Sequence, residues 1–102
     1  DIGTPRALLK ASVDIVKRSG DFLAMPGSTI DPTAVITGGS CIGPNSSIGA
    51  GAQIDGSIIE AGCVIGPNAK IIDSFVATGA KVDNGVKIAS SCVTNSEILS
   101  IP

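Results

Sequence analysis

The sequence predicts an all-β protein, a parallel β-helix of about four coils preceded by one N-terminal α-helix. The first observation is a repeat: IGAGAQIDGSII, which begins at Ile48, recurs in similar form at Ile65 and again at Val82. The second observation is a regular step of five or six positions between aliphatic side chains. The third is a composition with 13 glycines and only 2% aromatic residues, which suits narrow coils with tight turns.

The aliphatic step defines the coil. An α-helix has a shorter period and a strand alternates its side chains, so neither produces a step of six. A step of six fits one short strand plus one corner, and three such steps close a triangular coil, as from Ile48 to Ile65. The aliphatic positions are Ile30, Ile36, Ile42, Ile48, Ile54, Ile59, Ile65, Ile71, Val76, Val82, Ile88 and Val93.

Equivalent residues of successive coils are expected to stack in columns, because each coil pairs its backbone with the next at about 4.8 Å. Three aliphatic columns would then fill the prism, and small residues beside them would leave room for the corners. A serine column, which we interpret as a geometric requirement of the shortened corner, consists of Ser57, Ser74 and Ser91.

Two columns are expected on the outer surface. Gln53, Lys70 and Lys87 would stack there, and we interpret the lysines as solvated side chains. Ile58 and Phe75 share a second outer or corner column, which favours a contact surface.

The segment before Ile30 has a different pattern. Thr4-Pro5 is a typical helix start and Gly20 a typical stop. Between them, helical spacing connects Leu8, Leu9, Ser12, Ile15 and Val16. Residues 20–29 are expected to be an irregular connector, and helix and connector together would cap the first coil.

The far end of the repeat is expected to be irregular. Glu97 falls in the column of Cys63 and Ala80, where burying a charge would be costly. We therefore expect the coil to break there, with no evident cap before Pro102 and with cover from an oligomer partner or from further sequence.

Composition argues against several classes of function. A net charge of −2 with 16% charged residues gives no electrostatic reason to bind nucleic acid or an acidic membrane. The apolar runs are too short for a membrane span or a signal peptide.

Cys41, Cys63 and Cys92 form no metal-binding or redox spacing, so we expect free thiols, packed as small apolar residues, in a reducing, cytoplasmic compartment. The glycine-rich stretches at 43–49 and 49–51 are interpreted as corners and not as phosphate loops.

The hexads IDPTAV, ITGGSC, IGPNSS, IGAGAQ and IGPNAK resemble the hexapeptide repeat of left-handed β-helix proteins, and the left hand is implied by this resemblance alone. The stretch DIGTPRALLKAS, residues 1–12, resembles the close of the catalytic domain in sugar-1-phosphate nucleotidyltransferases of the mannose-1-phosphate guanylyltransferase type. The resemblance implies three parts: residues 1–19 end the catalytic domain and form a connecting helix, residues 20–29 connect, and residues 30–102 form the β-helix domain.

The same resemblance implies a function. The parent enzyme, of which this chain would be the C-terminal piece, would make an NDP-sugar (GDP-mannose is our preference) and pyrophosphate from an NTP and a sugar 1-phosphate. Asp1 matches a family aspartate that helps to hold Mg²⁺, and carboxylate oxygen suits that hard cation. The rest of the catalytic machinery is missing from these 102 residues, so we expect a structural, oligomerising or regulatory domain that is not catalytic alone and forms homo-oligomers.

Two alternatives stay open. The first is a hexapeptide-repeat acyltransferase, but the usual chemistry of those enzymes needs a histidine general base and this chain has none. The second is a regulatory homologue whose catalytic half is inactive.

Overall fold

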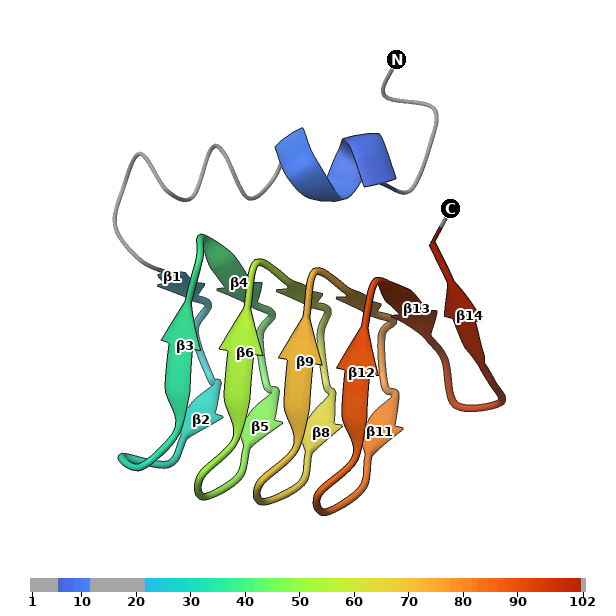
Figure 1. Ribbon diagram of the computed structural model, residues 1–102. Helices are drawn as coiled ribbons and strands as arrows, with labels where there is room; N and C mark the ends of the chain where they lie inside the picture. The colour runs from blue at the N-terminus through green and yellow to red at the C-terminus, as the bar shows by residue number, and fades with distance from the viewer. Residues whose placement is uncertain (1–5, 12–21, 102) are drawn as a thin grey trace.

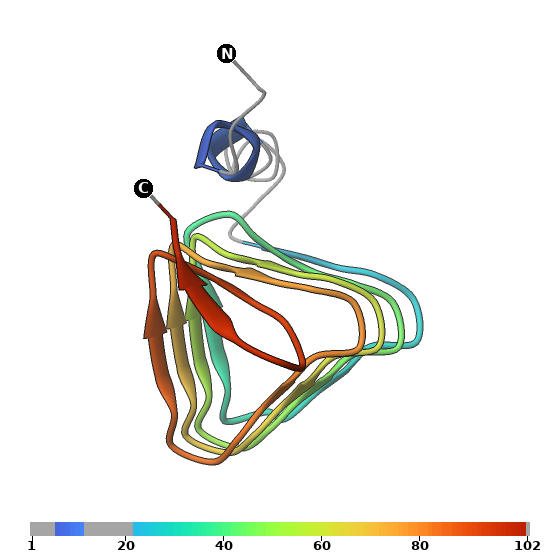
Figure 2. The same cartoon turned by 90° about the vertical axis from the view of Figure 1, so that its right-hand side faces the viewer.

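The structure, a computed structural model, describes residues 6–11 and 22–101. Within this part, short strands form three sheets that wind into a three-sided prism (Figure 1). We call the three sheets faces A, B and C. In Figure 2 the chain winds clockwise as it approaches the viewer, so the coil is left-handed, as the hexapeptide resemblance implies.

Each face stacks one short strand from every coil. Face A contains β1 (Phe22–Ala24), β4 (Ser40–Ile42), β7 (Ile58–Ile59), β10 (Phe75–Val76), β13 (Ser91–Val93) and β14 (Ile98–Ser100). Face B contains β2 (Thr29–Ile30), β5 (Ser47–Ile48), β8 (Val64–Ile65) and β11 (Lys81–Val82). Face C contains β3 (Val35–Thr37), β6 (Gln53–Asp55), β9 (Lys70–Ile72) and β12 (Lys87–Ala89). Described neighbours within a face pair in parallel, except that β14 pairs antiparallel with β13.

The predicted columns are confirmed by the strand register. Ile48 pairs with Ile65, and Ile65 with Val82, while the columns on faces A and C follow the same rule. Alternation along each strand points one aliphatic side chain inward and its neighbours outward. The core is therefore a stack of triangular layers, and Ile42, Ile59 and Val76 are completely buried in it.

The first coil contains one extra residue, and the register locates it. Ile36 pairs with Ile54 and Ile42 pairs with Ile59, so the offset between coils is longer by one position on face C than on face A. The extra residue therefore lies in the corner between these two faces. There Gly38 and Gly39 both have positive φ, where the next coil uses Gly56 alone. This backbone conformation is open to glycine at no steric cost.

The serine column is more than a small-residue requirement. The hydroxyl oxygen of Ser40 accepts from the backbone N–H of Ser57, Ser57 accepts from Ser74, and Ser74 accepts from Ser91, each at 3.0 Å. Each of these hydroxyls also donates to a carbonyl of its own coil, as Ser57 does to Asp55 at 2.9 Å. We call this column the serine ladder. It satisfies buried backbone donors at the corner between faces C and A.

Two expectations for the N-terminal region need correction. Residues 22–24, expected in an irregular connector, form β1, because Phe22, Leu23 and Ala24 pair in register with β4. Residues 6–11 are helical as expected, but these residues do not cap the first coil: Figure 1 shows them alongside the middle and last coils, and Arg6 Nη2 donates to the carbonyl of Ile101 at 3.1 Å. The expected helix signals at Thr4-Pro5, residues 12–16 and Gly20 lie outside the described residues.

The expected break at Glu97 is confirmed. The backbone N–H of Thr94 donates to the carbonyl of Glu97 at 2.9 Å, and the Thr94 hydroxyl accepts from the N–H groups of Ser96 and Glu97. This turn reverses the chain into β14 and leaves the Glu97 side chain exposed. The carboxylate therefore avoids the buried column that its sequence position would otherwise give it.

The serine ladder yields a stability prediction. Ser57→Ala removes the acceptor for the buried N–H of Ser74, while the carbonyl of Asp55 keeps a second donor, the N–H of Asp73. We expect the free energy of unfolding to fall by about 1–3 kcal/mol, measured by urea denaturation. The control is Ser47→Ala on the exposed side of β5, which should change it by less than about 0.5 kcal/mol. Equal effects of the two substitutions would show that the ladder is only a packing requirement.

Candidate functional site

The residue that the sequence links to metal binding cannot be placed, because Asp1 lies outside the described residues. Residues 6–11 and 22–101 contain no group of three or more His, Cys, Asp or Glu side chains that could hold a metal ion. Within the same residues, no helix has the length and apolar character needed to cross a membrane.

The two glycine-rich stretches are corners, as the sequence predicts. The carbonyl of Gly49 accepts from the N–H of Ala52 at 3.3 Å, and Gly51 between them has a φ of 69°. The other stretch turns at Asn45, whose φ is 59°. Both segments join one strand to the next around the prism, so their N–H groups serve the turn and do not form a phosphate cradle.

The outer surface of face A carries one continuous apolar column. Ile58 and Phe75 pair as the sequence predicts, and the strand register extends their column in both directions. We call it the face A stripe: Leu23, Cys41, Ile58, Phe75, Cys92 and Leu99. Its two ends are exposed and its four central members are half-buried. A stripe of this kind is suited to packing against another apolar surface.

Face C has a different outer surface. Gln53, Lys70 and Lys87 stack in one column as predicted, and all three are exposed. Beside them, Thr37 donates its hydroxyl hydrogen to Asp55 Oδ1 at 2.9 Å. A depression of about 400 Å³ covers this part of the face, and it is lined by Val35, Thr37, Gln53, Ile54, Asp55, Lys70 and Ile72.

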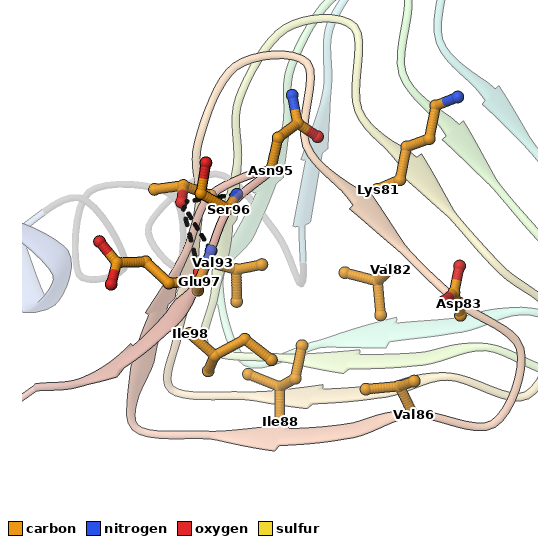
Figure 3. Close-up of a pocket in the computed structure, with 11 residues that line it drawn as sticks. Lys81, Val82, Asp83, Val86, Ile88, Val93, Asn95, Ser96, Glu97 and Ile98 are labelled. Carbon is orange, nitrogen blue, oxygen red and sulfur yellow. Dashed lines mark hydrogen bonds between the residues drawn. The ribbon is translucent and has the colours of Figure 1, made fainter.

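The second depression lies at the C-terminal end of the prism. Its volume is about 390 Å³, and its floor is the inward apolar face of the last coil: Val82, Val86, Ile88 and Val93. The turn at residues 94–97 and Ile98 form its other side (Figure 3). Figure 3 shows the polar side chains of Lys81, Asn95 and Glu97 pointing away from the apolar centre. Sequence periodicity could not reveal this site, because it exists only where the repeat stops.

These surfaces are suited to packing and binding more than to bond chemistry. The Cys63 thiol is completely buried, its sulfur lies 3.1 Å from the carbonyl oxygen of Ala77, and burial raises its pKa. Burial also raises the pKa of the Cys41 thiol on face A. A thiol needs a lowered pKa to act as a nucleophile near neutral pH, so these two cysteines are poor candidates. The chain supplies no histidine as a general base.

Comparison with known proteins identifies one family and one curated relative. Residues 18–99 match the model of a family described as the GMPPB C-terminal domain. A mannose-1-phosphate guanylyltransferase from Mycobacterium tuberculosis (strain ATCC 25618 / H37Rv) is 32% identical over 79 residues. The alignment covers 62% of this chain and only 22% of that protein, so the chain corresponds to a small part of its relative.

Similar solved structures include two mutant N-acetyltransferases from Caulobacter crescentus, each in complex with CoA and GDP-perosamine. The first, a GDP-perosamine N-acetyltransferase, is 21% identical with a TM-score of 0.33, and the match covers 99% of this chain and 60% of that one. The second, a perosamine N-acetyltransferase, is 16% identical with a TM-score of 0.31, and the match covers 85% and 64%. Likenesses at this level do not bear on function.

The burial of Cys63 predicts its reactivity. Cys41 and Cys92 are half-buried on the outside of face A, and all three cysteines are free. With an aromatic disulfide reagent at mildly alkaline pH, we expect the two outer thiols to react first and Cys63 only after unfolding, because the reagent can reach a half-buried thiol but not the completely buried Cys63. Cys63→Ser should remove only the slow phase, since Ser46 occupies the same column. Reaction of all three native thiols at one rate would contradict this burial.

Proposed function

This chain belongs to the GMPPB C-terminal domain family, and from that premise we propose that it is the C-terminal β-helix domain of a sugar-1-phosphate nucleotidyltransferase. The parent enzyme would join an NTP and a sugar 1-phosphate into an NDP-sugar and release pyrophosphate. The observation that carries the proposal is the family match over residues 18–99, which spans β1 to β13 and most of β14. The 32% identity to a mannose-1-phosphate guanylyltransferase supports GTP and mannose 1-phosphate as the substrates.

Within that enzyme, we assign the β-helix a structural, oligomerising or regulatory role. The described residues offer packing surfaces, above all the face A stripe, and no cluster of metal ligands. A flat apolar column on a rigid prism is suited to hold a second subunit or the catalytic domain in a fixed orientation. We therefore expect homo-oligomers that assemble through the β-helix, and no catalysis by this chain alone.

The metal expected in the parent enzyme is Mg²⁺, with Asp1 as one of its ligands. A carboxylate oxygen fits this hard cation, which would neutralise phosphate charge during nucleotidyl transfer. We expect the other ligands of this site to come from the catalytic domain of the parent enzyme.

A reducing, cytoplasmic location fits the cysteines. Cys41 and Cys92 share the face A stripe, but Ile58 and Phe75 separate them, so three coil spacings of about 4.8 Å lie between them. A disulfide needs Cα atoms closer than about 7 Å. Cys63 is buried in a different column, and all three thiols are free in this fold.

A pyrophosphate-release assay on the longer protein that contains this chain tests the proposal. We expect activity with GTP and mannose 1-phosphate to exceed that with other NTP and sugar 1-phosphate pairs, and none from residues 1–102 alone. Asp1→Asn in the longer protein should lower kcat at least roughly 10–100-fold. Loss of an outer-shell partner of a metal costs that much, and Asp1 would be a direct ligand. The matched control is Asp73→Asn, an exposed carboxylate at a corner of the β-helix that lines neither depression, which should leave kcat unchanged. Acetyl transfer from acetyl-CoA without pyrophosphate release would replace this proposal with the acyltransferase alternative.

A further inference from the structure

The C-terminal end of the prism leaves core side chains uncovered. On face A the inward column runs from Ile42 through Ile59, Val76 and Val93 to Ile98, because Val93 pairs with Ile98 across the hairpin. Ile42 is completely buried, whereas Ile98 at the end of the same column is 55% exposed. The last member of a core column therefore faces the apolar depression of about 390 Å³ without a following layer to cover it.

The backbone edges at this end are also incompletely covered. On face A the antiparallel β14 closes the edge of β13. On faces B and C, β11 and β12 are the outermost strands of their sheets among the described residues. An uncovered strand edge presents N–H and C=O groups that can pair with another segment, and proteins commonly cover such edges. Two open edges thus border the depression.

The N-terminal helix begins near the same end. Arg6 donates to the carbonyl of Ile101, and Ile101 is buried with only 7% exposure. Leu9 is also buried, whereas Leu8 beside it is 49% exposed. Figure 1 shows this helix alongside the coils, with its first residues directed toward β14. The described helix therefore begins near the C-terminal strand, where Arg6 contacts Ile101.

We propose that this hairpin end, formed by Ile98, the apolar depression and the open edges of β11 and β12, is the docking surface for the catalytic domain that precedes the chain. The inference rests on the proposed function, which supplies that domain. Because the helix enters here, the preceding domain has a high local concentration at this surface. The matching patch should insert an apolar side chain over Val82, Ile88 and Val93, with charged groups facing Lys81 and Glu97 at the rim.

Hydrogen exchange followed by mass spectrometry tests the location of the contact. We compare the longer protein with the isolated chain, both at low protein concentration. The amides of residues 94–101 and of β11 and β12 should exchange at least about tenfold more slowly in the longer protein, while β2 and β3 of the first coil stay unchanged. Equal exchange at the hairpin end, or protection confined to the first coil, would overturn the proposal.

A matched pair of substitutions tests the surface itself. Ile98 on β14 and Val35 on β3 have nearly equal exposure, 55% and 54%, at opposite ends of the prism. In the longer protein, Ile98→Asp should abolish the slowed exchange of residues 94–101, whereas Val35→Asp should preserve it. In the isolated chain the two variants should have similar unfolding midpoints in urea. An Ile98→Asp variant that retains full protection in the longer protein would refute the docking surface.

Three further outcomes separate this inference from its alternatives. Protection of the hairpin end that appears in the isolated chain and grows with protein concentration would assign the surface to a second copy and overturn the proposal. Pyrophosphate release by the longer protein without hairpin protection would leave the proposed function standing and refute the docking. Hairpin protection in a longer protein that releases no pyrophosphate would support docking of the preceding domain while refuting the nucleotidyltransferase assignment.

Discussion

The fold depends on the register between successive coils. Every coil must return to the same three faces after three strands and three corners, because its strands pair with those of the previous coil and its side chains stack on their counterparts. A slip of one position would turn every inward aliphatic side chain outward. Backbone pairing and core packing thus impose the same periodicity, and the sequence shows it directly as a repeat.

This constraint explains which parts of the structure are predictable. Columns such as Ile48, Ile65 and Val82 follow from spacing alone, and the corners follow from glycines and asparagines between them. Strand β1 is not predictable from the repeat. Its first residue, Phe22, pairs with Ser40, so a large aromatic side chain stands where the column otherwise contains serine. The position of the helix is not predictable for a different reason: local sequence predicts that a helix forms but not which surface buries Leu9.

The surfaces are predictable only where they belong to the repeat. Ile58 and Phe75 identify the face A stripe, but its extension through Cys41 and Cys92 requires the strand register, because the sequence alone favours core positions for the cysteines. The apolar end over Val82 and Ile88 depends on where the hairpin turns, which no periodicity encodes. A repeat thus predicts its own interior well, and it predicts the break at Glu97 but not the hairpin that follows it.

The serine ladder has a consequence for how such a domain can change in length. The first coil contains one extra residue and still keeps its hydrogen bond in the serine ladder. Gly38 and Gly39 accommodate this residue in the corner before Ser40, and the Ser40–Ser57 hydrogen bond is intact. The corner before each serine can therefore accept an inserted residue without displacing the core layers on either side. Loops that give one β-helix a specificity that another lacks would be most easily acquired at these corners, between faces C and A.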